Sequence, residues 1–338
     1  MNVWILTEGG RERGLGHVVR CRAIADALEE VGVRPCFVVE GDDSTEAVLG
    51  SSQSETREWI REPARLADVV GRETIVLVDS ITITQEGCQA IEQTFAHTAF
   101  IDDYQRRNYR HSLVIDWTIG IEDDPRYAAR TDRPGVEYLL GARYAALRRA
   151  FWDIPEKDIA PGIGNILLTF GGSDIRNLTP PVLRSVVDHY PNVRKSVIVG
   201  HGYGNVAAIE DARDANTRIM RRPTTTEIVE AMLTADVAIC GGGQTLYELA
   251  RVGVPAIATH LIENQRFDVE GWRRTGAIRV AGSWDDPSLM ARVLDALKSL
   301  ESPGERATVS RAGRSLIDGG GARAIRDRLL GKRGRRDP

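Results

Sequence analysis

Short apolar runs alternate with helical stretches along the whole chain. Five such runs occur in the first half, at Val3–Leu6, Phe37–Val39, Ile75–Val78, Ala99–Ile101 and Leu113–Ile115. The second half repeats the rhythm with Ile166–Phe170, Ser196–Val199, Val237–Cys240 and Ala256–Thr259. Runs that are apolar throughout, rather than alternating with polar positions, are typical of parallel strands covered by helices on both faces. The pattern therefore predicts an α/β protein with two open parallel sheets.

Two domains are expected from the length of the chain. Its 338 residues exceed the roughly 250–300 that one hydrophobic core usually holds. Proline, glycine and charged residues without periodicity mark a linker at 151–162. We predict an N-terminal domain at 1–150, a C-terminal domain at 163–328 and a basic tail at 329–338. The tail is interpreted as a solvated end, because a single basic run without aromatic residues is a weak signal for nucleic acid.

The composition is that of a globular protein, with 42% hydrophobic and 27% charged residues and a net charge of −4. This balance does not favour a nucleic-acid partner or an anionic membrane. No run approaches the roughly 20 apolar residues of a membrane span, and the first apolar run is too short for a signal peptide. The four cysteines show no CxxC spacing, which is typical of reduced thiols. We therefore expect a cytoplasmic protein without membrane insertion.

Polar residues follow several of the predicted strands, where open parallel sheets bind their ligands. A glycine loop runs from the first strand into a helix that begins near His17. Because a helix N-terminus disfavours the cationic imidazole, His17 is a candidate general base. The alternative is a histidine that caps or packs the helix. The predicted substrate contacts of this half are Gly14, Gly16, Arg20, Asp79 and Asp102.

This glycine loop is an incomplete dinucleotide fingerprint. Gly14 and Gly16 are followed by Val19 where the third glycine should stand. The sequence therefore argues against a nicotinamide cofactor. It also shows no cluster of metal-ligand residues, so we expect neither a cofactor nor a metal.

The most informative segment is G-G-G-Q-T-L-Y-E-L-A, which follows the run ending at Cys240. Glycines allow backbone amides to turn outward, and the helix start near Gln244 adds its positive end. Together they predict a diphosphate site that uses no lysine. Glu248, early in that helix, is placed to accept both hydroxyls of a ribose. The alternative is a packing turn in which Glu248 complements the helix dipole.

Two further loops of the second half carry candidate contacts. E-N-Q follows the strand ending at Thr259, and amides at such a position hydrogen-bond sugar hydroxyls or an attacking water. F-G-G-S-D follows another strand, and it either contacts phosphate or forms a glycine turn in which Ser173 or Asp174 caps the next helix. The predicted contacts are Gly171, Gly172, Ser173, Glu263, Asn264 and Gln265.

Four motifs in order carry a resemblance to a known family. They are G-L-G-H-V-V-R-C, L-L-G-A-R-Y-A-A-L-R-R-A-F, L-T-F-G-G-S-D-I-R-N-L-T, and G-G-G-Q-T-L-Y-E-L-A-R-V-G-V-P-A followed by E-N-Q. Over nearly its whole length the chain resembles the UDP-2,4-diacetamido-2,4,6-trideoxy-β-L-altropyranose hydrolases of pseudaminic acid synthesis and the related spore-coat polysaccharide proteins. It is more distantly similar to the N-acetylglucosaminyltransferase that completes the peptidoglycan lipid precursor.

The resemblance implies a GT-B-like fold, with two Rossmann-like domains whose parallel sheets face each other across a cleft. It implies that the C-terminal domain binds UDP, with uracil near the loop before Ile228 and the ribose at Glu248. It assigns His17 as the catalytic histidine and Asn264 as the amide that contacts the sugar or water. It places the diphosphate at Gly241, Gly242, Gly243, Gln244 and Thr245.

One departure from the family concerns the sugar pocket. After a central strand the chain reads V-D-S-I, so Ile81 stands where the family has a tyrosine. We expect a hydrolase that releases UDP from a UDP-activated amino or deoxy sugar in nonulosonic acid or surface polysaccharide biosynthesis. The alternatives are a glycosyltransferase with the same UDP site and a non-catalytic nucleotide-sugar binder. Neither the sugar nor the oligomeric state is predicted.

Overall fold

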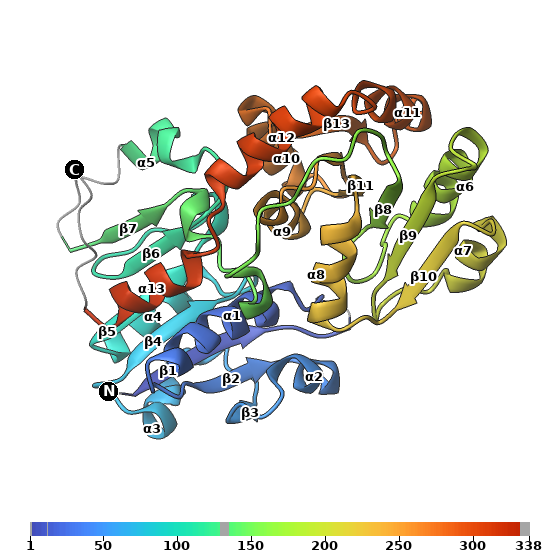
Figure 1. Ribbon diagram of the computed structural model, residues 1–338. Helices are drawn as coiled ribbons and strands as arrows, with labels where there is room; N and C mark the ends of the chain where they lie inside the picture. The colour runs from blue at the N-terminus through green and yellow to red at the C-terminus, as the bar shows by residue number, and fades with distance from the viewer. Residues whose placement is uncertain (1, 12, 129–134, 332–338) are drawn as a thin grey trace. The chain divides into compact units, whose positions relative to one another are not determined.

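The computed structural model describes residues 2–11, 13–128 and 135–331. The chain forms two compact units, each built on one parallel sheet (Figure 1). The first unit holds Met1–Arg149 and Gly319–Pro338, and the second holds Ala150–Asp318. The two α/β domains expected from the pattern of apolar runs are thus present.

The first domain contains a seven-stranded parallel sheet in the order β3-β2-β1-β4-β5-β6-β7. Its strand order reverses between β1 and β4, the position where such sheets form a ligand crevice. The strands are β1 (Val3–Glu8), β2 (Cys36–Glu40), β3 (Ser54–Thr56), β4 (Ile75–Asp79), β5 (His97–Ile101), β6 (Leu113–Asp116) and β7 (Glu137–Leu140). The α-helices described are α1 (Gly16–Glu30), α2 (Glu46–Leu49), α3 (Ala67–Val70), α4 (Gln85–Thr94), α5 (Pro125–Ala128) and α13 (Gly321–Leu329).

The second domain contains a six-stranded parallel sheet in the order β10-β9-β8-β11-β12-β13. Here the order reverses between β8 and β11. The strands are β8 (Asn165–Thr169), β9 (Arg194–Val199), β10 (Thr217–Arg221), β11 (Val237–Gly241), β12 (Ala256–His260) and β13 (Ile278–Ser283). The helices are α6 (Thr179–His189), α7 (Val206–Ala212), α8 (Thr225–Thr234), α9 (Thr245–Val252), α10 (Asn264–Thr275), α11 (Leu289–Ser299) and α12 (Pro303–Leu316).

Each sheet is covered by apolar side chains from its own helices. In the first domain, Leu6, Val76 and Phe100 from neighbouring strands join one buried cluster. In the second domain, Ile166 and Ile239 do the same. Strands β4 and β11, in the middle of the two sheets, are buried along their whole length, which explains the continuous apolar runs at these positions.

The last helix, α13, belongs to the first domain, whereas the prediction assigned residues up to 328 to the second domain. α13 lies against α1 (Figure 1), and Arg326 Nη1 donates to the Ala27 carbonyl at 3.3 Å and to Glu30 at 2.7 Å. The segment expected as a linker also differs, because Phe151 and Trp152 are buried in the second domain. Of the predicted basic tail, residues 332–338 lie outside the described residues.

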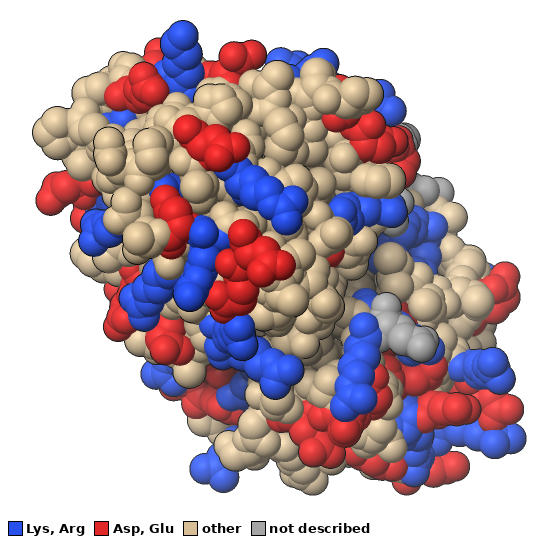
Figure 2. Space-filling model, turned by 90° about the vertical axis from the view of Figure 1, so that its right-hand side faces the viewer, with Lys and Arg blue, Asp and Glu red and all other residues tan. Residues whose placement is uncertain are grey.

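Charges of both signs are interspersed over the face shown in Figure 2, without a continuous basic stripe. Among the described residues, no helix combines the length and the apolar character needed to cross a membrane.

Candidate functional site

Four carboxylates stand in a row at the carboxyl ends of neighbouring strands in the first domain. Glu8, Asp79 and Asp116 are the last residues of β1, β4 and β6, and Asp102 follows β5 directly. All four have 0% relative exposure. Because a buried carboxylate is costly unless donors surround it, each must be held by groups of the chain itself.

Asp79 is held by a histidine and an arginine from the first turns of α1. His17 Nδ1 lies 2.8 Å from Asp79 Oδ1, and Arg20 donates from Nε to Oδ2 at 2.6 Å and from Nη2 to Oδ1 at 2.5 Å. Burial by itself raises the pKa of Asp79, but the charges of Arg20 and His17 and their hydrogen bonds bring it well below its usual range. The carboxylate is therefore ionised.

This pairing fixes the tautomer of His17. An ionised carboxylate only accepts hydrogen bonds, so Nδ1 of His17 carries the proton and donates it to Asp79. Arg20 Nη2, 3.1 Å from the same nitrogen, cannot donate to it in that state. Nε2 then holds the basic lone pair, and the His17 side chain is 18% exposed whereas that of Asp79 is fully buried. A base oriented by a buried acid is the arrangement used in hydrolytic triads.

Arg20 is itself surrounded by groups of the chain. Its Nη1 donates to Asp103 Oδ2 at 2.8 Å, and its guanidinium lies 5.0 Å from the centre of the Trp117 ring. Together with the two bonds to Asp79, these contacts engage all three guanidinium nitrogens. The structure thus places Arg20, predicted as a substrate contact, where it holds the partner of His17.

The loop after β4 is fixed from two sides. Glu8 accepts hydrogen bonds from the backbone amide of Ile81 at 2.5 Å and from that of Thr82 at 2.9 Å. Burial raises the pKa of Glu8, but its hydrogen bonds, of which the one from the Thr82 side chain has the largest effect, outweigh burial and lower that pKa. Arg107 Nη2 donates to the Ile81 carbonyl at 3.0 Å. Ile81, which the resemblance predicts to replace a tyrosine, is 50% exposed.

The other two carboxylates hold neighbouring loops. Asp102 accepts from Arg107 N at 3.0 Å and therefore contacts the chain itself, although it was predicted to contact substrate. Asp116 accepts from Tyr104 N at 2.9 Å. Burial, followed by the charge of Asp103, raises the pKa of Asp116 to about 7.

The glycine loop before α1 leaves open space beside His17. Gly14 has a φ of 79°, and its carbonyl accepts from Gly10 N at 3.0 Å. A Cβ atom at Gly14 or Gly16 would meet nothing within 4 Å. The loop therefore offers the room for a ligand that its sequence predicts.

In the second domain, the glycine loop between β11 and α9 packs closely on α10. A Cβ at Gly242 would lie 2.2 Å from Val269 Cγ2, whereas one at Gly243 would meet only Gln265 Nε2 at 3.6 Å. The E-N-Q segment and the glycine loop are therefore neighbours. α9 begins at Thr245, and Gln244 is the residue just before it, at the helix start predicted from the sequence.

Substitution of Gly242 and of Gly243 by alanine should change the free energy of unfolding by different amounts. Gly242→Ala should lower the free energy of unfolding by about 1–3 kcal/mol, because the new methyl group overlaps Val269. Gly243→Ala should change it little. Urea denaturation of both variants measures the difference, and equal stabilities would contradict the close packing of the loop on α10.

Glu248 and the E-N-Q residues lie at the starts of two helices of the second domain, α9 and α10. Glu248 is the fourth residue of α9 and is 6% exposed. Gln265 Oε1 accepts from Leu261 N at 2.9 Å, and Glu263 is exposed. Asn264 begins α10, but its side chain lies outside the part of the chain that the structure describes.

In the loop after β8, the carboxylate of Asp174 accepts hydrogen bonds from the amides of Leu178 and Thr179 at the start of α6, at 2.9 Å each, which agrees with the capping alternative. Gly171 has a φ of 78°, and the Gly172 carbonyl accepts from Gly202 N at 2.9 Å. Ser173 is partly exposed. Phosphate contact by Gly171, Gly172 and Ser173 stays a prediction.

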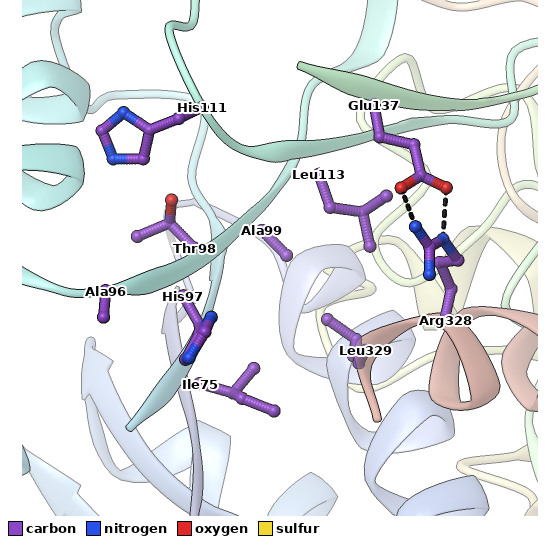
Figure 3. Close-up of a pocket in the computed structure, with 10 residues that line it drawn as sticks. All are labelled: Ile75, Ala96, His97, Thr98, Ala99, His111, Leu113, Glu137, Arg328 and Leu329. Carbon is purple, nitrogen blue, oxygen red and sulfur yellow. Dashed lines mark hydrogen bonds and ion pairs between the residues drawn. The ribbon is translucent and has the colours of Figure 1, made fainter. Parts of the chain in front are cut away.

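Two cavities lie at opposite kinds of strand end, one at carboxyl ends in the second domain and one at amino ends in the first. One, of about 420 Å³, lies at the ends of β9 and β10, where Gly200, His201 and Arg222 line it. Arg222 begins the segment that leads to Ile228 in α8. The other, of about 180 Å³, lies at the amino ends of β4–β7 beside the ion pair of Arg328 with Glu137 (Figure 3). This cavity lies at the edge of the sheet opposite to His17, so it does not include the candidate catalytic residues His17 and Asp79.

Within residues 2–11, 13–128 and 135–331, no cluster of three histidine, cysteine or acidic side chains is placed to hold an ion.

No family model matches the chain, but it is similar in sequence to several known proteins. It is 24% identical to the spore coat polysaccharide biosynthesis protein SpsG of Bacillus subtilis over 333 residues, 95% of each chain. It is 22% identical over 276 residues to an uncharacterized protein of Methanocaldococcus jannaschii, covering 79% of this chain and 57% of that protein. It is 22% identical over 268 residues to the Helicobacter pylori pseudaminic acid cytidylyltransferase and UDP-2,4-diacetamido-2,4,6-trideoxy-β-L-altropyranose hydrolase, covering 78% of this chain and 45% of that protein.

Solved structures share the fold at low sequence identity. Acinetobacter baumannii MurG matches with a TM-score of 0.64 at 14% identity, over 98% of this chain and 99% of that chain. Staphylococcus aureus MnaA in complex with UDP matches with a TM-score of 0.68 at 13% identity, over 98% of both chains. The chain has a GT-B-like fold. The resemblance to the pseudaminic acid hydrolase and spore-coat proteins is thus confirmed at modest identity.

Two residues at this carboxyl edge of the first sheet were not identified from the sequence. They are Asp116, which accepts from Tyr104 N, and Trp117, whose ring lies against the guanidinium of Arg20. A signal was present for Asp116, because it directly follows the apolar run Leu113–Ile115. An acid at the last position of a buried strand must find donors, and it therefore marks a built site.

Proposed function

We propose that this protein hydrolyses a UDP-activated amino or deoxy sugar to UDP and the free sugar, in the biosynthesis of a nonulosonic acid or a surface polysaccharide. The observation that carries the proposal is the hydrogen bond between His17 Nδ1 and the ionised Asp79, which leaves Nε2 as a base. The names of the Bacillus and Helicobacter relatives support the class of substrate.

The second domain binds the UDP moiety in this proposal. Backbone amides of the loop at Gly243 and the N-terminus of α9 receive the diphosphate, where helix dipole and amides favour negative charge. Glu248 accepts the ribose hydroxyls. Asn264 and Glu263 contact the sugar or the attacking water. The fold shared with MnaA, whose structure contains UDP, supports a nucleotide site in this chain.

The reaction follows from the chemistry of His17. Nε2 removes a proton from water while the water oxygen bonds to the anomeric carbon. The bond between that carbon and the diphosphate oxygen breaks, and UDP leaves with the electron pair. Asp79 stabilises the imidazolium, as a buried acid does in a triad, and the histidine then releases its proton to solvent. Amides and the helix dipole stabilise the charge on the leaving diphosphate.

The test is UDP release from a panel of UDP-sugars with no acceptor present. We expect UDP and free sugar in equal amounts, with oxygen-18 from labelled water in the sugar product. His17→Ala is the control, and GDP- and CMP-sugars test the nucleotide. Release no faster than that of the control on every donor would reject the proposal.

A glycosyltransferase is the second candidate, because the calicheamicin glycosyltransferase CalG4 shares the fold. An acceptor hydroxyl would then replace water, with the same UDP site. A transferase is nearly silent with the donor alone, so product analysis with and without acceptor mixtures separates the two activities. UDP binding without turnover on any donor would instead favour a non-catalytic binder.

A further inference from the structure

We propose that Arg176 binds the negatively charged diphosphate of the nucleotide sugar, an assignment that rests on the proposed function. Arg176 lies in the loop after β8, and its guanidinium is fixed at two points. Nε donates to the Leu261 carbonyl at 2.8 Å, and the guanidinium carbon lies 4.1 Å from the centre of the Trp284 ring.

These two anchors carry the side chain along the carboxyl edge of the sheet. Leu261 follows β12 and Trp284 follows β13, whereas Arg176 follows β8. In the sheet, β11 lies between β8 and β12, so the arginine bridges loops on both sides of the strand that ends in the glycine loop. The Leu261 side chain also packs against that loop, since a Cβ at Gly241 would meet it at 2.8 Å.

Only one of the three guanidinium nitrogens of Arg176, Nε, has a hydrogen-bond partner among the described residues. Among the described residues, Nη1 and Nη2 of Arg176 have neither a hydrogen bond nor an ion pair. Asp285 is the acidic neighbour, and its carboxylate accepts from the Ser283 hydroxyl. Arg176 is thus an oriented cation whose two terminal nitrogens are available to a ligand.

This arrangement suits a phosphate better than a single point charge does. A planar guanidinium presents parallel N–H groups that match two phosphate oxygens. Stacking on Trp284 and the bond to Leu261 fix the plane before the ligand arrives, which reduces the ordering cost of binding. The glycine loop and α9 offer amides without a cation, and Arg176 supplies one.

The experiment compares the affinities of UDP and uridine by calorimetry and competition. Arg176→Ala should weaken UDP binding by about tenfold or more and leave uridine unchanged, because only UDP carries the diphosphate. Arg176→Lys should recover part of the loss. Arg311→Ala, which removes an exposed arginine of α12, is the matched control and should bind UDP like the wild type.

Three results would overturn the assignment in distinguishable ways. UDP affinity unchanged in Arg176→Ala excludes phosphate contact. Equal weakening of uridine and UDP means that Arg176 only shapes the loop. A wild-type protein that binds no UDP rejects the proposed function itself, and the assignment with it.

Discussion

Replacing Asp79 by asparagine should lower kcat for UDP release by about 10⁴-fold, with a much smaller change in KM. Asparagine has the same shape but no charge, so it neither holds the proton on Nδ1 of His17 nor stabilises an imidazolium. UDP binds through the second domain in the proposed function, which is why KM should change little. Asp79 does not touch the substrate, being fully buried, and acts by positioning His17.

The tautomer of His17 gives this prediction a second readout. In the wild type, the ¹⁵N chemical shifts of the ring should report a protonated Nδ1, and in Asp79→Asn this preference should be lost. Asp103→Asn is the matched control, since Asp103 contacts Arg20 and not His17. It should keep the wild-type tautomer and most of the activity. Equal losses in the two variants would show that the cluster acts only as a structural unit.

The sequence predicted the interior of both sheets but not their edges. All four strands absent from the prediction, β3, β7, β10 and β13, are edge strands. A central strand is covered on both faces and by neighbours on both sides, so its sequence is apolar throughout. An edge strand is partly exposed, as the alternating burial of β3 shows, and its polar residues hide it from a search for apolar runs.

The candidate site divides in a similar way. His17, Asp79 and Arg20 were each identified singly, because each follows a strand or begins a helix. Their pairing depends on the order β1-β4 in the sheet, which places the start of α1 beside the end of β4. Residues 59 and 62 positions apart in the chain become hydrogen-bond partners only through that topology. Local sequence patterns do not show which residues that are far apart in the chain become neighbours in the fold.

Replacing Arg20 by methionine should lower the free energy of unfolding by about 3–5 kcal/mol near pH 8. The substitution keeps the volume of the side chain but leaves Asp79 buried without its cation. Arg22→Met is the matched control on the same helix. Arg22 pairs with Asp26 and Glu29 nearer the surface, so its loss should cost less than about 1 kcal/mol.

The cost of the Arg20 substitution should depend on pH, and the sign follows from Asp79. In the wild type, the lowered pKa of Asp79 contributes stability that is present above its ordinary value of about 3.9 and lost as the pH falls below it. Without Arg20, burial dominates and raises that pKa, so the variant takes up a proton on folding and gains stability as the pH falls. Urea denaturation should therefore give a smaller difference between wild type and variant near pH 5 than near pH 8. A difference that is independent of pH would mean that Arg20 stabilises the domain through Trp117 and Asp103 rather than by compensating the charge of Asp79.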